Sequence, residues 1–151
     1  MKIHIITKQQ VHETARVLVE GGWHSLESAK KEIRLRMLKR EVFVAVNNKK
    51  IVGLFIYFRN YSHEANALEY IVVSKNHKRN GVAKQMLLKY IQISRKETPK
   101  KQKYCLSSTH VTNKVSIKMH LSFGFEKIGI LKGLHYGMDE IFFGYDLRGE
   151  K

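Results

Sequence analysis

Two neighbouring features of the sequence could carry chemistry: a carboxylate in an apolar stretch, and a basic turn that contains a glycine. Glu69 is the one charged residue in the strand-forming run Leu68–Val73. A carboxylate in such a run is rarely buried without a reason, so it is a candidate proton acceptor or ion-pair partner. The polar segment Ser74–Asn80 follows it and contributes Lys75, His77, Lys78 and Arg79.

A helical pattern follows this turn. Apolar residues recur at spacings of three and four at Ala83, Met86, Leu87, Tyr90 and Ile91. A strand, a basic turn and a helix in this order present backbone N–H groups and the positive end of the helix dipole to an anion. Gly81 has no side chain to keep a phosphate away from the backbone. We therefore predict a phosphate-binding turn, with an ordinary strand-to-helix connection as the alternative.

The composition indicates an ordered globular protein of one domain. The chain has 151 residues, 43% hydrophobic content and a single proline. No apolar run approaches the roughly 20 residues that span a bilayer, and the N-terminal segment becomes polar too early for a secretory signal. The one cysteine, Cys105, cannot form an internal disulfide. We expect a cytoplasmic protein without a membrane partner, in which Cys105 is an inert core thiol.

The net charge of +15 favours an anionic ligand or partner, because it would repel strongly cationic substrates at long range. Binding to nucleic acid or to the ribosome is therefore one explanation of the charge. The alternative is an organism whose proteins generally have lysine-rich surfaces. Basic residues are concentrated on one face of the predicted helix Leu26–Leu38 and in the linker Lys96–Lys103 around Pro99.

Hydrophobic periodicity predicts one α/β domain with the element order β-α-α-β-β-β-α-β-α-β-β. The predicted elements lie at Lys2–Thr7, Gln10–Glu20, Leu26–Leu38, Val42–Val46, Ile51–Phe58, Leu68–Val73, from Gly81 to near Arg95, Tyr104–Ser108, Thr112–Ser122, Phe125–Leu131 and Met138–Leu147. Ser25 is expected to cap the second helix, and Asn47-Asn48 to turn a β-hairpin. The segment Lys132–Gly137 is expected to be a loop.

One segment, Lys78-Arg79-Asn80-Gly81-Val82-Ala83, resembles the cofactor motif of the GNAT superfamily of acyl-CoA-dependent N-acyltransferases. That motif reads Arg/Gln-x-x-Gly-x-Gly/Ala and lies between the family's fourth strand and the following helix. The glycine and the alanine match, whereas Lys78 departs from the first position. Lysine still supplies a charge that attracts phosphate, but it lacks the planar fork of arginine.

A second segment begins at Asn113 and resembles the family pattern Asn-x-x-Ala-x-x-x-Tyr-x-x-x-Gly-Phe. Asn113, Gly124 and Phe125 match at the same spacing. Ser116 replaces the alanine, and His120 replaces the tyrosine. Because both motifs occur in the expected order, and the element order covers essentially the whole chain, the chain is similar to this family throughout.

The resemblance implies a fold and a co-substrate. The fold would be α/β, with a mixed, mostly antiparallel central sheet of about six to seven strands, flanked by about four helices and splayed at its central strands. Acetyl-CoA would place its pyrophosphate on the N–H groups of residues 79–83. Its pantetheine arm would lie beside Ile71, Val72 and Val73, and Asn113 would form a hydrogen bond to that arm. The remaining phosphate charge would meet Lys75, Lys78, Arg79 and Lys84.

Acetyl transfer needs a neutral amine, a polarised thioester carbonyl and a proton for the departing thiolate. A backbone N–H near Val73 would polarise the carbonyl. We assign Glu69 as the base, acting through water, because it shares strand parity with Val73; a structural ion pair is the alternative. Three outcomes are open for the acid: His120 replaces the tyrosine, Tyr136 enters from a loop, or solvent protonates the thiolate. The alternative for His120 is a structural helix histidine.

In this family the acceptor site is usually bounded by two loops, one between the first two helices and one between the last two strands. Here the first loop contains Trp23 and His24, and the second contains His135 and Tyr136. Both loops combine glycines with aromatic and imidazole groups, as binding loops often do. The alternative for Trp23 is a core residue.

The predicted function is transfer of an acetyl group from acetyl-CoA to a primary amine of a small molecule or a protein, without a metal. High positive charge disfavours aminoglycosides, polyamines and histone tails as acceptors. The competing hypothesis is a catalytically inactive acyl-CoA-binding or RNA-associated module on the same fold. A Rossmann domain fits less well, because Gly-x-Gly-x-x-Gly is missing. Assembly as a homodimer is left open.

Overall fold

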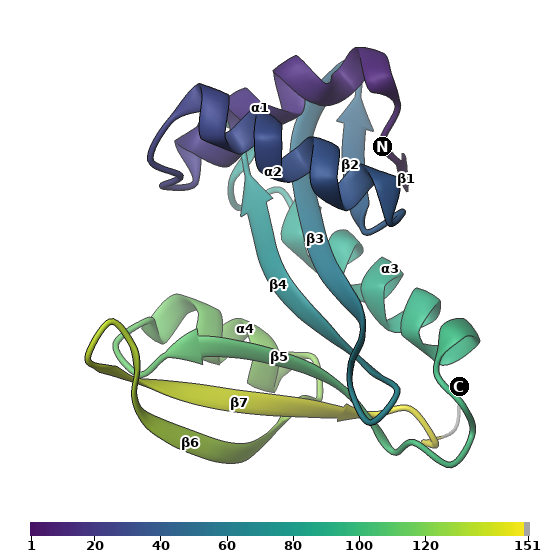
Figure 1. Ribbon diagram of the computed structural model, residues 1–151, viewed down its shortest axis with the longest axis vertical. Coiled ribbons are helices and arrows are strands. Elements are labelled where there is room, and N and C mark those ends of the chain that lie inside the picture. Colours follow the sequence, from purple (N-terminus) through teal and green to yellow (C-terminus); the bar gives the residue numbers. More distant parts are fainter. Residues whose placement is uncertain (150–151) are drawn as a thin grey trace. The chain divides into compact units, whose positions relative to one another are not determined.

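A sheet of seven strands organises the protein in the computed structural model, which describes residues 1–149 (Figure 1). The strands are β1 (Lys2–Ile5), β2 (Val42–Asn47), β3 (Lys50–Ser62), β4 (Ala65–Val73), β5 (Tyr104–His110), β6 (Glu126–His135) and β7 (Met138–Asp146). The helices are α1 (Val11–Glu20), α2 (Leu26–Leu38), α3 (Val82–Glu97) and α4 (Lys114–Ser122). The strand order is β1-β2-β3-β4-β5-β7-β6. The predicted mixed α/β fold is confirmed.

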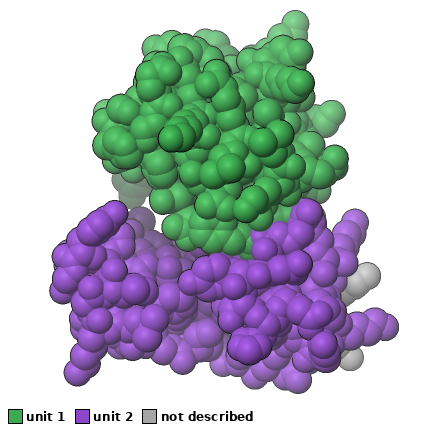
Figure 2. All heavy atoms as spheres, viewed as in Figure 1, with its two compact units in different colours: residues 1–58, 69–90 green, residues 59–68, 91–151 purple. Residues whose placement is uncertain are grey.

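The chain divides into two compact units, each built from two segments (Figure 2). The first unit consists of Met1–Phe58 and Glu69–Tyr90, and the second of Arg59–Leu68 and Ile91–Lys151. Because the segments interleave along the chain, the division does not correspond to a linker in the sequence. The assignment of a single domain stays a prediction.

In the first unit, α1 and α2 lie side by side over one face of β2 and β3 (Figure 1). Apolar residues of α1 recur every three or four positions, which gives the helix one face to bury. The aliphatic core beneath the two helices includes Ala15, Leu18, Ala29, Ile33, Val44, Leu54 and Ile56. Ser25 caps α2 as predicted, because its side chain accepts the Ser28 N–H at 3.2 Å.

The other face of β3 is aromatic and packs against α3. Tyr90 of α3 lies with its ring centroid 6.4 Å from that of Phe55 and 6.0 Å from that of Tyr57. Because side chains alternate along a strand, the aliphatic residues between these aromatics face α1 and α2 instead. The helix comes so close that a Cβ on Gly53 would lie 3.0 Å from the Met86 side chain. This packing holds the start of α3 beside β3.

In the second unit, β5, β7 and β6 pair antiparallel in that order, and α4 packs against them. Cys105 of β5 is fully buried. β4 pairs with β5 in parallel, Ala67 with Leu106 and Leu68 with Ser107. This pairing is short compared with β4, which continues to Val73.

Three strands depart from their predicted bounds by three residues or more. β3 continues to Ser62 rather than ending at Phe58, and β4 begins at Ala65 rather than Leu68. The added residues of β3 are mostly polar and exposed, so hydrophobic patterning cannot distinguish them from a loop. β6 reaches His135, so most of the predicted loop Lys132–Gly137 is strand. Its residues are exposed as well, and pairing with β7 decides their conformation.

The helices agree with the sequence more closely. α2 has the predicted bounds, and α1 begins at Val11, after a short 3₁₀ turn at Lys8–Gln10. α4 begins at Lys114 rather than Thr112, because Asn113 is its N-cap. None of the helices within residues 1–149 is both long enough and apolar enough to cross a membrane.

Candidate active site

The turn between β4 and α3 is held by hydrogen bonds within the first unit. The Ser74 N–H donates to a carbonyl of β3 at 3.0 Å, and the Ser74 hydroxyl lies 2.8 Å from Nδ1 of His77. The Lys75 N–H donates to the Glu20 carboxylate at 2.9 Å. After these anchored residues, positions 78–81 are all exposed. The base of the turn is therefore fixed, while its basic tip faces solvent.

Arg79 and Gly81 both adopt left-handed backbone conformations, with φ of 65° and 73°. Glycine does so readily, whereas another residue loses roughly 1–2 kcal/mol. A Cβ built on Gly81 would meet no protein atom within 4 Å. The backbone at this position is thus open to a ligand, and its conformation gives a second reason for glycine.

α3 begins directly after the turn. Its first intrahelical hydrogen bond joins the Gln85 N–H to the Gly81 carbonyl at 3.1 Å. The N–H groups of Val82 and Ala83 precede this bond and have no acceptor inside the helix. Together with the helix dipole, they give this end of the helix a geometry that suits an anion. The predicted phosphate-binding residues thus have a geometry that fits the pyrophosphate of acetyl-CoA.

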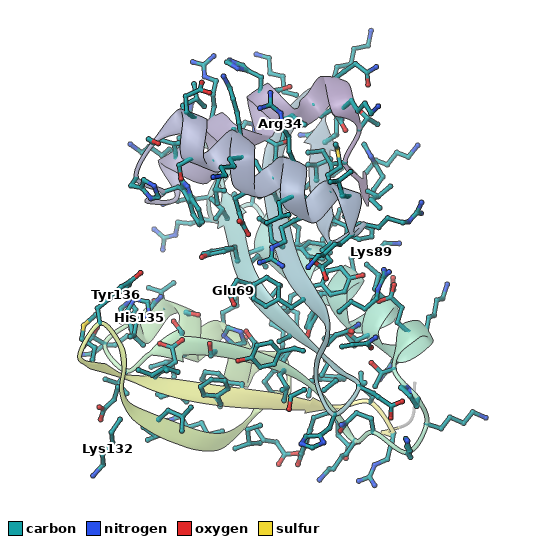
Figure 3. The ribbon with its side chains drawn as sticks, viewed as in Figure 1. Arg34, Glu69, Lys89, Lys132, His135 and Tyr136 are labelled. Carbon is teal, nitrogen blue, oxygen red and sulfur yellow. The ribbon has the colours of Figure 1, made fainter. Side chains whose placement is uncertain are left out.

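The end of β4 that belongs to the first unit directs alternate side chains to opposite faces. Tyr70 and Val72 pack against the core beneath α1 and α2, so Glu69, Ile71 and Val73 lie on the other face. Glu69 is exposed on β4 (Figure 3), which leaves its carboxylate accessible to water. This parity suits a base that acts through water, and the role itself stays a prediction.

Trp23 is anchored by two contacts within the first unit. Its Nε1–H donates to the Ser28 hydroxyl at 2.8 Å, and its ring meets that of Tyr70 edge-on at 5.2 Å. It also packs against the core beneath α1 and α2. His24 stacks on Trp23 at 5.6 Å and is exposed. The geometry supports the core alternative for Trp23, and His24 is the more accessible group of the pair.

Asn113 lies directly before α4 in the second unit. Its Oδ1 accepts the Ser116 N–H at 3.1 Å, which makes it the N-cap of the helix. Such a cap contributes about 1 kcal/mol. The side-chain nitrogen still carries two donor hydrogens. Asn113 can therefore cap the helix and donate to a carbonyl group at the same time.

His120 lies on the buried face of α4, with a relative exposure of 1%. Its Nδ1–H donates to the Ser116 carbonyl at 2.8 Å, and its Nε2 accepts from the Ser107 hydroxyl at 2.7 Å. Burial lowers the pKa of His120 below its ordinary value, opposed only in part by the bond to the Ser116 carbonyl. A neutral ring with both nitrogens engaged supports the structural alternative for His120. A catalytic role for this histidine remains to be tested.

The turn between β6 and β7 carries His135 and Tyr136 (Figure 3). Tyr136 is 98% exposed and has a left-handed φ of 50°. Nδ1 of His135 lies 3.4 Å from Oε2 of Glu140, and its ring lies 5.2 Å from that of His110. His135 is therefore oriented by neighbouring strands, whereas the Tyr136 side chain projects into solvent.

Glu140 and His110 are candidates that the sequence did not single out. They face each other across β7 and β5. Glu140 is only 8% exposed, and its Oε2 has no hydrogen-bond partner within residues 1–149. A nearly buried carboxylate beside the His135 imidazole suits a cationic amine, because a buried charge needs a partner. The sequence feature that could have identified Glu140 is a carboxylate next to apolar strand residues, which is also the feature that marked Glu69.

No group of three or more His, Cys, Asp or Glu side chains in the described part of the chain could hold a metal ion. The candidate groups are thus the basic glycine turn before α3 and an exposed glutamate in the first unit. The second unit adds the helix cap Asn113 and the cluster of His110, His135 and Glu140.

Comparison with known proteins identifies the family. A sequence model of the acetyltransferase (GNAT) family matches residues 9–125. The chain belongs to this family. The match includes the turn before α3 and the segment from Asn113 to Phe125, which are the two GNAT-like motifs of the sequence. β6 and β7, with His135 and Glu140, lie entirely beyond the matched residues. No curated protein sequence matches the chain.

Solved structures of GNAT proteins resemble this one along almost the entire chain. A GNAT acetyltransferase from Bacillus cereus has a TM-score of 0.79 and 21% identity, with 96% of each chain covered. The ribosomal-protein-alanine N-acetyltransferase from Brucella melitensis has a TM-score of 0.77 and 22% identity, covering 97% of this chain and 99% of that one. Aminoglycoside 6'-acetyltransferase type Ii has a TM-score of 0.82 and 13% identity, with both chains covered to 100%. The TM-scores establish the shared fold, and the identities, all below 25%, leave the acceptor open.

Proposed function

We propose that this GNAT protein transfers an acetyl group from acetyl-CoA to a primary amine. The observation that carries the proposal is the start of α3, where Gly81 leaves the backbone open and the first N–H groups of the helix lack acceptors. Exposed cations at Lys78 and Arg79 add charge beside this backbone. These features suit the pyrophosphate of acetyl-CoA, and GNAT membership supports acyl transfer.

Glu69 is the proposed base. Its carboxylate accepts, through a water molecule, the proton that the amine loses as its nitrogen bonds to the acetyl carbonyl carbon. A backbone N–H near Val73 donates to the carbonyl oxygen, which gains negative charge before the carbon–sulfur bond breaks. The departing thiolate then takes a proton. Because both nitrogens of His120 are engaged, we assign that proton to the exposed Tyr136 hydroxyl or to water.

The proposed acceptor contact is the β6–β7 hairpin. Glu140 offers a carboxylate that lacks a hydrogen bond at one oxygen, and His135 lies beside it. A primary ammonium group would pair with this carboxylate and release one proton to solvent, and the neutral amine would then react. The net charge of +15 disfavours acceptors with many positive charges. A single protein amine fits better.

A second candidate is a catalytically inactive acyl-CoA-binding or RNA-associated module. The hydrogen bonds at both nitrogens of His120 favour this candidate, because the residue at the position of the family's usual general acid then has a structural role. The basic segment Lys96–Lys103 favours it as well. This candidate predicts RNA binding that falls steeply with salt, without release of CoA from acetyl-CoA.

The melting temperature with and without saturating acetyl-CoA tests the proposed coenzyme site. A ligand at about 100 times its dissociation constant adds roughly 2.7 kcal/mol, which raises the midpoint by roughly 5–10 °C in a chain of this length. We expect this shift in the wild type and its loss in Gly81→Glu, which places a bulky negative side chain against the anion site.

Gly133→Glu is the matched control. Gly133 also has a left-handed φ of 68°, and a Cβ there would meet nothing within 4 Å. The control should melt lower than the wild type, as Gly81→Glu does, while keeping the shift with acetyl-CoA. Equal shifts in both variants would rule out the turn as the coenzyme site. A binding-competent protein that releases no CoA with any amine would favour the inactive module.

A further inference from the structure

The second unit contains a cavity of about 250 Å³ at the C-terminal end of α3. Its wall includes Arg95 in the last turn of α3 and Arg148 just after β7. The segment that follows α3 adds Thr98, Lys100 and Gln102. We propose that this cavity binds a phosphate group, independently of the acetyltransferase reaction.

The charge of the cavity wall points to an anion. Arg95, Lys100 and Arg148 are cationic, and none of the residues found to line the cavity is acidic. Arg148 is oriented by Asp146, whose carboxylate oxygens lie 3.4 Å from its guanidinium nitrogens. Within residues 1–149, neither Arg95 nor Lys100 forms an ion pair, whereas the nearby Lys101 pairs with Glu64 at 2.8 Å. Positive charge in the wall is therefore only partly compensated.

Two residues of the same wall each contain a buried polar atom that lacks a hydrogen-bond partner within residues 1–149. Nε of Arg95 and Oγ1 of Thr98 are both buried, and neither has a partner in the described part of the chain. Buried polar groups nearly always have partners, so each exception needs an explanation. The Arg95 guanidinium lies 5.7 Å from the Tyr145 ring centroid. The Thr98 N–H is used in a bond to Ser94, at 2.9 Å. Both side chains are thus held in place while their polar atoms remain unpaired.

Phosphate suits these groups better than a carboxylate does. A phosphate group carries up to two negative charges and three strong acceptor oxygens, which matches Arg95, Lys100 and a hydroxyl better than a single charge would. Arginine side chains bind phosphate through paired N–H groups. The phosphate could belong to a small molecule or to the RNA backbone, and the two sources share the chemistry of this wall.

Titration of the full chain with inorganic phosphate, at constant ionic strength set by chloride, tests the proposal by calorimetry. Arg95→Gln removes a cation and should weaken binding about tenfold or more, since hydrogen bonds to charged groups are strong. Thr98→Val keeps the shape of the side chain, removes only the hydroxyl, and should weaken binding severalfold. Lys96→Gln is the control, because it removes a charge from the same helix end at a residue outside the cavity wall. Its affinity should stay within about twofold of the wild type.

Short single-stranded RNA distinguishes the two sources. RNA that displaces inorganic phosphate and loses affinity in Arg95→Gln and Thr98→Val would assign the cavity to a backbone phosphate. Phosphate binding that RNA leaves unchanged would assign it to a small phosphorylated molecule. Absence of phosphate binding in the wild type, or equal binding in the wild type, Thr98→Val and Lys96→Gln, would overturn the proposal even if Arg95→Gln does not fold.

Discussion

The His120 ring and the Ser107 hydroxyl form a hydrogen bond of 2.7 Å in the interior of the second unit. His120 belongs to α4 and Ser107 to β5, and both residues are buried. The same ring stacks on Phe143 of β7, with 4.8 Å between centroids. His120 therefore ties a helix to two strands, at the position where the GNAT motif usually carries a tyrosine.

Replacing His120 with alanine should lower stability far more than activity. The change leaves a cavity and two unpaired buried groups, which together cost about 2–5 kcal/mol. We expect a corresponding loss in the unfolding free energy from urea titration, and a change of less than about threefold in kcat per folded molecule. The exposed His24→Ala should alter stability by less than about 0.5 kcal/mol. A folded His120→Ala whose kcat falls about a hundredfold or more would instead identify the general acid.

The pH dependence of stability provides an independent test of His120. Because burial lowers its pKa in the folded protein, the unfolded chain binds the proton more tightly. The stability contributed by neutral His120 is fully present above the unfolded pKa of about 6.5 and is lost as the pH falls from there towards the lower folded pKa. The slope approaches about 1.4 kcal/mol per pH unit. Urea titrations from about pH 7.5 to 5 should show a steeper loss in the wild type than in His120→Gln. Parallel curves would mean that His120 does not titrate differently on folding.

Glu69→Gln should abolish most acetyl transfer without weakening acetyl-CoA binding. General-base catalysis contributes typically 100- to 10,000-fold, so kcat should fall within roughly that range. Glu64→Gln is the control: Glu64 is an exposed carboxylate just before β4, in an ion pair with Lys101. Its kcat should be unchanged. A Glu69→Gln variant that loses stability but keeps its kcat would assign Glu69 to a structural ion pair.

Arg79→Gly should separate stability from coenzyme binding. Arg79 has a left-handed φ of 65°, so glycine relieves roughly 1–2 kcal/mol of strain, offset in part by the greater entropy of the unfolded chain. We expect the melting temperature to stay equal or rise, while the dissociation constant of acetyl-CoA rises severalfold through loss of the cation. Arg40→Gly, at a φ of 59°, should show the same effect on stability with unchanged acetyl-CoA affinity. Tighter binding in Arg79→Gly would contradict a role for its charge.

Glu140→Gln should raise KM for the amine and leave KM for acetyl-CoA unchanged. One carboxylate oxygen of Glu140 makes no hydrogen bond within residues 1–149, so the neutral amide should cost little stability, below about 1 kcal/mol. Steady-state kinetics with a peptide amine as acceptor measures the two KM values separately. Glu126→Gln on exposed β6 is the control. A Glu140→Gln variant with unchanged acceptor KM would remove this carboxylate from the acceptor contact.

The turn before α3, the capped start of α2 and the order of strands and helices could be predicted from the sequence, because each depends on residues close together in the chain. Gly81, the basic residues before it and the apolar period of α3 lie within one short segment. The ends of β3 and β6 could not be predicted in this way, since their exposed polar residues become strand only through pairing with a neighbour.

Local sequence therefore determined the family motifs and the basic glycine turn before α3, and tertiary structure decided the environment of the remaining polar side chains. The burial of His120 depends on Ser107 and Phe143, which come from two other strands. Glu140 meets His110 and His135 only across β5, β6 and β7. These residues lie far apart in the sequence, and the free energy that brings them together comes from burial and strand pairing rather than from any local preference.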